Sequence, residues 1–308
     1  MASIATGLAA LSALALVVGQ GGRFNDFLDL PNHFAPLTTA MGGLGGAAGW
    51  ALGRRRSRPF AAACGIVALL LGVGLLAPEY AAAPQTGPSG GERFRIIQFN
   101  ALADNRRADE AVTWIRSQRP DVIVLEEGGV VRRKLLATGD YYVACRDCLA
   151  SILSRRKPLS DNAAEPRVGW SPSVSVASFA DARGPYTVAG MHLAWPVRPR
   201  VNREEFARVL SRLDGLPRDR MILAGDFNST PWSFVQRRYD RQLGLERRTR
   251  GVFSWPAERV SHNRLPALAP FLPIDHVYAG SGWRLVEVAR GPRLGSDHYP
   301  VLVTLAPV

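Results

Sequence analysis

Three apolar segments lie within the first 80 residues, and they constrain the fold of this chain more than any other feature. Residues 2–18 and residues 60–77 are each about as long as a helix that crosses a bilayer. The middle segment, residues 37–52, is shorter and weaker, so it either spans the membrane or lies at its surface. Its small residues would allow other helices to pack closely against it. We therefore predict a membrane region over residues 1–79 with two to three transmembrane helices.

The charges around these segments predict their orientation. Residues 54–58, between the second and third segments, are almost entirely arginine, and short basic loops stay in the cytoplasm. The third helix then leads outwards, so we expect a multi-pass protein of the bacterial inner membrane whose remaining chain is extracytoplasmic, in the periplasm. The alternative is that residues 2–18 are a cleaved signal peptide, but no basic residue precedes them and two more apolar segments follow.

Residues 80–91 are rich in Ala, Gly and Pro, a composition typical of a flexible linker, and we expect one domain over residues 92–308. The chain has a formal net charge of +12, most of it in this domain. Such a surplus favours phosphate-rich partners, either nucleic acid or anionic lipid headgroups. Almost all the cations are arginines, which a GC-rich genome would also produce, so the charge alone does not identify a substrate.

Two of the three cysteines, Cys145 and Cys148, lie close together in the predicted domain. Outside the cytoplasm a local disulfide is the expected state of such a pair. A zinc site is a weaker alternative, because no second pair of Cys or His residues has matching spacing.

Apolar strands in this domain end repeatedly in polar residues. The clearest case is the stretch 221–230, where four apolar residues are followed by Gly225, Asp226 and Asn228. Asp226 and Asn228 are two residues apart, so in extended geometry they point to the same side. The alternative is a solvated turn, since Gly, Asp and Asn all favour turns. Other strands end in the same way, at Asn100, Glu127 and His192.

Helical periodicity is strongest over residues 202–213, where Asn202 and Glu205 resemble a capping box. Helices are also expected over residues 109–118 and 234–243, and residues 173–179 and 186–191 alternate like the two strands of a hairpin.

The polar residues at the strand ends suit one kind of chemistry. His192 and His298 can transfer protons near neutral pH or donate to a phosphate oxygen, and Asp275 is placed to orient His298. Hard oxygen atoms suited to Mg²⁺ or Mn²⁺ come from Asn100, Glu127, Asp226 and Asp297. Water activated by a base and a metal, attacking phosphorus, is the reaction that these groups favour.

Six motifs in order along the domain resemble the endonuclease/exonuclease/phosphatase, or DNase I-like, superfamily. They are Gln-Phe-Asn (98–100), Pro-Asp-Val-Ile-Val-Leu-Glu-Glu (120–127), Gly-Met-His-Leu (190–193), Gly-Asp-Phe-Asn-Ser-Thr-Pro (225–231), Ile-Asp-His (274–276) and Gly-Ser-Asp-His (295–298). The resemblance implies an α+β fold, a four-layered α/β/β/α sandwich, after the transmembrane helices. It also implies a divalent-metal phosphoesterase.

The resemblance implies a role for each site residue. Asn100, Glu127 and Asp297 match metal-site residues, and His192 matches a phosphate-contacting histidine. Asp226 and Asn228 match the pair that positions the nucleophile and the phosphate, whereas Asp275 and His298 match the acid–histidine pair. Glu126 departs from the pattern, because Gln is common there; it would alter metal binding or be solvated. His276 is expected to pack or bond locally, and His33 and His262 are expected to be loop residues without a function.

The leading hypothesis is therefore a Mg²⁺- or Mn²⁺-dependent, membrane-tethered nuclease, with Trp195, Trp232 and Trp255 available to stack on bases. A lipid-headgroup phosphodiesterase is the first alternative, and an inactive membrane-tethered binding module is the second. A transporter fits poorly, because the apolar segments contain no charged residue.

Overall fold

A computed structural model describes residues 1–81, 92–145, 148–162, 174–258 and 266–308. The chain forms two compact units. One contains Met1–Ala83 together with Ser229–Arg238, and the other contains Pro84–Asn228 together with Tyr239–Val308. The sequence predicted a membrane region and a separate domain, but it did not predict that a segment from late in the chain belongs with the N-terminal helices.

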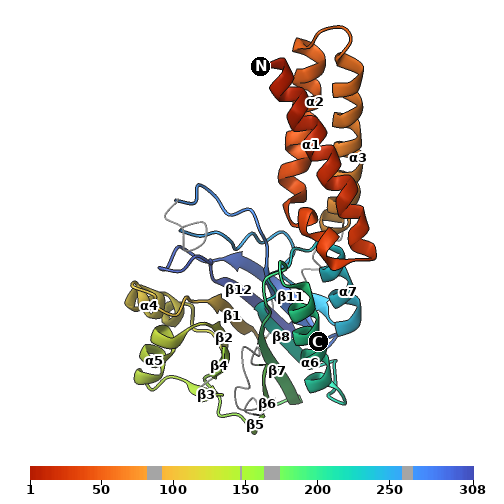
Figure 1. The fold of residues 1–308 in the computed structure, drawn as a ribbon. Helices are drawn as coiled ribbons and strands as arrows, with labels where there is room; N and C mark the ends of the chain where they lie inside the picture. Colours follow the sequence, from red (N-terminus) through yellow and green to blue (C-terminus); the bar gives the residue numbers. More distant parts are fainter. Residues whose placement is uncertain (82–91, 146–147, 163–173, 259–265) are drawn as a thin grey trace. The chain divides into compact units, whose positions relative to one another are not determined.

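The first unit is a bundle of three helices that lie side by side (Figure 1): α1 (Ala2–Gln20), α2 (Ala35–Leu52) and α3 (Arg58–Ala81). Two short 3-10 helices, η1 (Gly21–Arg23) and η2 (Asp26–Phe34), join α1 to α2. Glycines bring the helices together. A Cβ atom on Gly46 would lie 2.6 Å from the Cα atom of Gly65, so these two backbones touch. The close packing expected of the middle segment is thus present.

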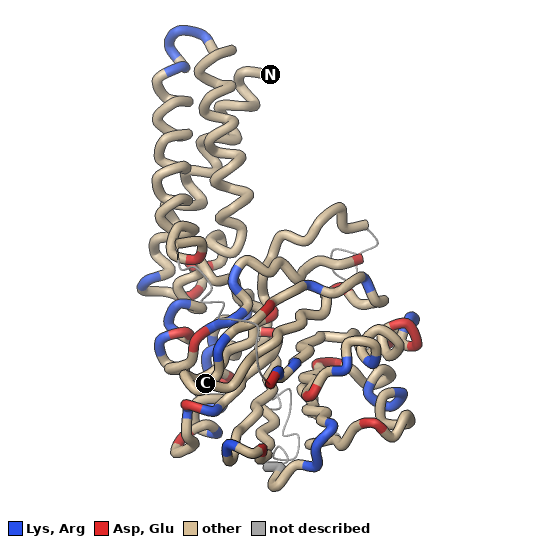
Figure 2. Tube along the Cα trace, turned by 180° about the vertical axis from the view of Figure 1, so that it is seen from behind, with Lys and Arg blue, Asp and Glu red and all other residues tan. Residues whose placement is uncertain are grey.

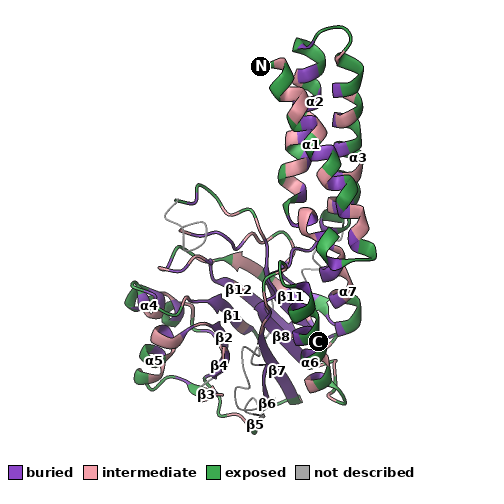
Figure 3. Cartoon of the chain, viewed as in Figure 1, coloured by how far each residue is buried: buried purple, intermediate pink, exposed green. Residues whose placement is uncertain are grey.

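Among the described residues, two helical stretches are long and apolar enough to cross a membrane by length and composition, Ala2–Arg23 and Arg58–Ala81. The outer faces of the bundle carry exposed residues (Figure 3), many of them large and apolar, such as Leu11, Leu44 and Leu70. The loop between α2 and α3 carries the basic residues seen at the end of the bundle in Figure 2.

The second unit contains two six-stranded sheets. The first has the order β11-β12-β1-β2-β4-β3 and is built from β1 (Phe94–Asn100), β2 (Val122–Glu126), β3 (Tyr142–Ala144), β4 (Ala150–Ser154), β11 (Trp283–Arg290) and β12 (Val301–Pro307). The second has the order β5-β6-β7-β8-β10-β9 and is built from β5 (Ser160–Asn162), β6 (Ser175–Asp181), β7 (Gly184–His192), β8 (Met221–Asp226), β9 (Glu246–Arg247) and β10 (Asp275–Ala279).

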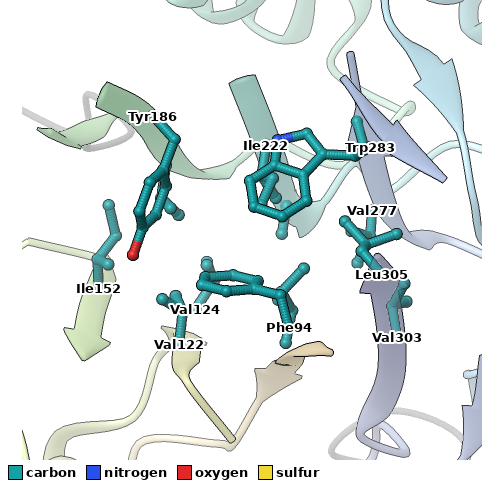
Figure 4. Close-up of a cluster of buried hydrophobic side chains, with 14 of the residues drawn as sticks. Phe94, Val122, Val124, Ile152, Tyr186, Ile222, Val277, Trp283, Val303 and Leu305 are labelled. Atoms are coloured by element: carbon teal, nitrogen blue, oxygen red, sulfur yellow. The ribbon is translucent and has the colours of Figure 1, made fainter. Parts of the chain in front are cut away.

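The main core lies between the two sheets. In β1 and β2, alternate residues such as Phe94 and Val124 point towards the second sheet and meet residues such as Ile222 and Val277 (Figure 4). The intervening residues of β1 and β2 face the other way and pack under α4 (Ala108–Gln118) and α5 (Gly129–Ala137). Because both faces of β2 are covered, its residues Val122–Leu125 form a continuous apolar run in the sequence.

Helix α6 (Pro199–Leu213) and the second half of α7 (Phe234–Leu243) add the remaining layer, where the rings of Phe206 and Tyr239 stack with centroids 3.6 Å apart. The helix, sheet, sheet, helix arrangement confirms the predicted α+β, DNase I-like architecture. The predicted hairpin is also present as β6 and β7, and Cys145 and Cys148 form the expected disulfide.

The predicted capping box of α6 is wrong. The helix begins three residues earlier than expected, at Pro199, whose fixed backbone suits a first helical position. Asn202 and Glu205 are instead both bonded to Ala194. The Asn202 amide donates to the carbonyl of Ala194 at 2.6 Å, and the amide N–H of Ala194 donates to the Glu205 carboxylate at 2.5 Å. They therefore fix the loop that follows His192.

Candidate active site

Strand pairing brings three predicted site residues, His192, Asp226 and Asp275, to one edge of the second sheet. Parallel strands β7 and β8 end together, so that His192 pairs in register with Asp226. Antiparallel strand β10 begins at the same level, with Asp275 opposite Asp226. The close approach of β7 and β8 requires a glycine at position 225, because a Cβ atom there would lie 1.9 Å from the carbonyl oxygen of Met191.

Asp226 lies at the centre of the site and is almost completely buried. Its Oδ1 atom accepts a hydrogen bond from the backbone N–H of Asn228 at 2.8 Å, and its Oδ2 atom accepts one from the amide of Asn100 at 3.2 Å. The Nε2 atoms of His192 and His298 each lie 3.6 Å from Oδ2. Burial raises the pKa of Asp226 to about 6, against the opposing effect of a cation on His298.

Asp275 and His298 form a buried acid–histidine pair, with 2.8 Å between Oδ2 and Nδ1. Burial alone would lower the pKa of His298, but the carboxylates of Asp275 and Asp226 outweigh it and raise this pKa to about 10. Burial acts to raise the pKa of Asp275, but the His298 cation and its hydrogen bond lower it overall. With Asp275 bonded to Nδ1, the Nε2 atom of His298 is left facing Asp226.

Sequence reasoning missed the part played by Gln98. Its amide donates to Asp275 at 2.7 Å and to Glu126 at 3.0 Å, so it holds both carboxyl groups. The signal was available, because Gln98 precedes Asn100 by two residues and so lies on the same side of β1. Ser254 was also missed; the backbone N–H of Asp275 donates to its hydroxyl oxygen at 3.3 Å.

Glu126 is fully buried, so the alternative that it is solvated is wrong. Burial raises its pKa well above the ordinary value, and the negative charges of Asp275 and Asp226 raise it further. A protonated glutamic acid has nearly the shape of glutamine and, like it, both donates and accepts hydrogen bonds. The protonated form of Glu126, which the raised pKa favours, would match in charge and shape the Gln expected at this place from the resemblance.

Glu127 and Asn100 lie next to Asp226; Asn100 is buried and Glu127 is part-exposed. The backbone of Glu127 is left-handed, with φ of +49°, which turns its half-buried side chain away from that of Glu126. The amide nitrogen of Asn100 lies 3.4 Å from Oε1 of Glu127 and 3.2 Å from Oδ2 of Asp226. Two carboxylates thus converge on one amide nitrogen, and the carboxylate oxygens are the hard ligands that a divalent cation prefers.

Asp297 was predicted to bind the metal, but in the structure its carboxylate is hydrogen-bonded to a side chain. Its carboxylate accepts a hydrogen bond from the indole of Trp255 at 3.3 Å. It also helps to raise the pKa of His298 through its charge. The loop around it is anchored by Ser296, whose hydroxyl donates to the carbonyl of Asn100 at 2.6 Å and accepts from the N–H of His298 at 3.0 Å.

Within the described part of the chain, one group of acidic and histidine side chains is close enough to share a metal ion: Asp226, Asp275 and His298. This set differs from the predicted ligands. Asp275 and His298 are already hydrogen-bonded to each other, an arrangement that suits proton transfer. The group of Asn100, Glu127 and Asp226 suits a cation better, because its two carboxylates converge beside Asn100 and Glu127 is part-exposed.

The remaining predicted residues also lie at this edge. Asn228 has a left-handed backbone, with φ of +50°, and its amide donates to the carbonyl of Leu193 at 2.9 Å. The Nδ1 atom of His192 is buried and has no hydrogen-bond partner among the described residues. His276, expected to be structural, is buried against Phe227 and Thr249 outside this group. His262 lies outside the described residues.

Residues 94–298 match the model of the Endonuclease/Exonuclease/phosphatase family. This match covers about two thirds of the chain, and the protein therefore belongs to this family. The fold and the family together define the class of protein as a phosphoester hydrolase. A search among curated proteins found no match.

Solved structures show the same fold at low sequence identity. An endonuclease/exonuclease/phosphatase family protein from Bacteroides thetaiotaomicron is 16% identical, with 70% of this chain and 97% of that chain covered and a TM-score of 0.53. TDP2 of D. rerio, solved with a single-strand DNA product, is 17% identical, with 70% and 100% covered and a TM-score of 0.55. The mannosyl-6-phosphatase Bt3783 of Bacteroides thetaiotaomicron is 16% identical, with 69% and 99% covered and a TM-score of 0.53.

Proposed function

We propose that this protein is a membrane-tethered, extracytoplasmic phosphoesterase that hydrolyses phosphodiester or phosphomonoester bonds with the help of Mg²⁺ or Mn²⁺. The observation that carries the proposal is the buried Asp275–His298 pair, whose remaining ring nitrogen faces Asp226 at 3.6 Å. A histidine oriented in this way can accept a proton from water at one defined atom.

In the proposed reaction, a water oxygen forms a bond to phosphorus while the bond between phosphorus and the leaving oxygen breaks. The Nε2 atom of His298 takes the proton of the attacking water, and Asp275 holds the resulting imidazolium in place. Asp226 and Asn228 position the water and the phosphate. His192 donates to a phosphate oxygen, which stabilises the charge that develops there.

Asn100, Glu127 and Asp226 would hold the divalent cation, with Asp297 as the further ligand predicted from the sequence. A bound cation polarises the phosphoryl group and neutralises the charge that develops in the transition state. A neutral His298 is needed for base catalysis, and a nearby dication would favour that form by repelling the proton.

The test uses the full chain in detergent with bis(4-nitrophenyl) phosphate and 4-nitrophenyl phosphate. Wild type should release nitrophenolate with Mg²⁺ or Mn²⁺ and not with a chelator. His298→Ala should lower kcat about 100-fold or more, because it removes the base. Asp140→Asn, at an exposed carboxylate paired with Arg116, should leave kcat unchanged. Equal activity of wild type and His298→Ala would refute the role given to His298.

Nucleic acid is the substrate predicted from the basic charge and the aromatic residues. Of the three tryptophans predicted to stack on bases, Trp232 and Trp255 are buried, whereas Trp195 is half exposed. Of these three tryptophans, only Trp195 is therefore exposed enough for a base to stack on it. Protein TDP2, with its DNA product, is the neighbour that supports a nuclease.

A lipid-headgroup phosphodiesterase is the second candidate, and one observation favours it. Large apolar side chains are exposed on loops of the second unit, including Trp195, Val197 and Leu268, the last of which is 97% exposed. Exposed apolar residues on loops are typical of proteins that bind lipid surfaces. Comparing hydrolysis of single-stranded DNA with that of phosphatidylglycerol vesicles would choose between the two substrates.

A further inference from the structure

The segment Ser229–Arg238 directly follows Asn228 in the chain, yet it folds with the N-terminal helices. Its partner there is η2, which connects α1 to α2. The carboxylate of Asp29 accepts hydrogen bonds from the backbone N–H groups of Phe234 at 3.1 Å and of Val235 at 2.8 Å. The first N–H groups of a helix have no partner within the helix, so Asp29 caps α7 from about 200 residues away.

His33 contacts the same segment near its start, at Thr230. Its Nδ1 atom lies 3.3 Å from the backbone nitrogen of Thr230 and 3.2 Å from the Thr230 hydroxyl. A backbone N–H can only donate, so Nδ1 must be an unprotonated acceptor. The backbone carbonyl of His33 accepts a further hydrogen bond from the indole of Trp232 at 3.1 Å. His33 is buried, and burial lowers its pKa to about 4, so the ring is neutral and keeps this acceptor.

The two residues are themselves firmly held. Asp29 is 1% exposed, and the amide of Asn32 donates to it at 2.6 Å. The same amide donates to the carbonyl of Gly19, near the end of α1, at 2.8 Å. Asp26 adds an ion pair with Arg238 at the far end of the segment. Capping, burial and charge pairing therefore all act on one stretch of ten residues.

This stretch begins one residue after a strained position of the candidate active site. Asn228 has a left-handed backbone, and its N–H is bonded to Asp226. Such a conformation persists where the surrounding structure holds it. Thr230, bonded to His33, is two residues further along the chain. Whatever fixes Thr230 also limits the freedom of the backbone at Asn228.

We propose that Asp29 and His33 are positioning residues for catalysis: from the loop between the first two helices they fix Ser229–Arg238 and so hold Asn228, and through it Asp226, in the reactive arrangement. This inference rests on the proposed phosphoesterase function. It gives η2, between the first two helices, a role in positioning the active site in addition to tethering.

The experiment compares variants of the full chain in detergent, with bis(4-nitrophenyl) phosphate and Mn²⁺. His33→Asn retains an acceptor near the position of Nδ1, whereas His33→Leu has a similar size and no acceptor. We expect His33→Leu to lower kcat between about 10- and 100-fold at nearly unchanged KM, because a small misplacement of reacting groups lowers the rate by this much. His33→Asn should keep most of the wild-type kcat. Asp29→Leu and Asp29→Asn form a second pair with the same expected order.

Phe27→Ala is the control, because its side chain lies in η2 and is exposed. It should have wild-type kcat and KM. A purely structural role would lower the amount of folded protein without changing kcat per folded molecule, so active protein is counted after size-exclusion chromatography. If the leucine variants do not fold, Thr230→Val, which removes only the hydroxyl contact with His33, replaces them.

Two failures are distinguishable. Wild-type protein that hydrolyses no phosphoester would refute the proposed function. Active wild-type protein together with leucine variants, or Thr230→Val, of unchanged kcat would refute the positioning role and leave the proposed function standing. Equal loss of kcat in His33→Asn and His33→Leu would also refute it, because the acceptor would then make no difference.

Discussion

Glu126 is a buried acidic residue in a network where the family resemblance leads one to expect Gln. Its neighbours Asp275 and Asp226 are carboxyl groups, and burial removes the water that would otherwise stabilise a third negative charge. The raised pKa favours a protonated Glu126, which would be equivalent to the Gln expected from the family resemblance. The donor to both Glu126 and Asp275 is Gln98, which completes the network.

This equivalence predicts that Glu126→Gln retains activity within about threefold of wild type, because neither charge nor shape changes. Glu126→Ala should lower both kcat and Tm, because it leaves a cavity and removes one partner of Gln98. Steady-state kinetics and thermal unfolding of the full chain in detergent would measure both. A Gln variant as inactive as the Ala variant would mean that the carboxylate itself is needed.

His298 predicts how stability depends on pH in metal-free protein. Its pKa in the folded state is raised from 6.5 to about 10. A raised pKa means that the folded state binds the proton more tightly, so this stabilisation is complete below pH 6.5 and is lost as pH rises towards 10. With a chelator present, Tm of wild type should fall more steeply over this range than Tm of His298→Gln. Parallel curves would show that His298 is not charged in the folded protein.

At the scale of elements, the junction of β7 and β8 sets the geometry of the site. Gly225→Ala would place a methyl group against the carbonyl of Met191, separating two strands that deliver His192 and Asp226. We expect a loss of about 1–3 kcal/mol in unfolding free energy, as for other overpacked sites, with a clear loss of kcat. Gly129→Ala in α5, where the nearest atom would be 3.8 Å away, is the matched control and should retain both. Denaturant unfolding and kinetics would test the pair.

Elements whose signals are local were predictable from the sequence. The hairpin of β6 and β7 and the strand that ends at Asp226 follow from alternation and apolar runs, and ordered motifs indicated which strand ends converge. The capping box predicted from Asn202 and Glu205 was wrong, because both side chains are hydrogen-bonded to the loop residue Ala194 instead. The roles of Asp29 and His33 were not predictable, since their partners lie about 200 residues away and no periodicity links them.

At the scale of the whole molecule, the sequence predicts a linker over residues 80–91. Residues 92–308 are therefore the natural fragment to express. That fragment would contain Ser229–Arg238 without its partners. The N–H groups of Phe234 and Val235 would lose the Asp29 cap, and Arg238 would lose its ion pair with Asp26. Losing a helix cap alone costs about 1 kcal/mol, and the indole of Trp232 would also lose the His33 carbonyl to which it donates.

We therefore expect the fragment 92–308 to have a lower Tm than the same domain in the full chain and a lower kcat on bis(4-nitrophenyl) phosphate. A chain that keeps residues 1–91 but carries Asp29→Leu and His33→Leu should show the same loss of kcat, because both lack the same bonds to residues 229–238. If the fragment is as active as the full chain, residues 229–238 do not need Asp29 and His33 to hold Asn228. The N-terminal helices would then serve only as an anchor.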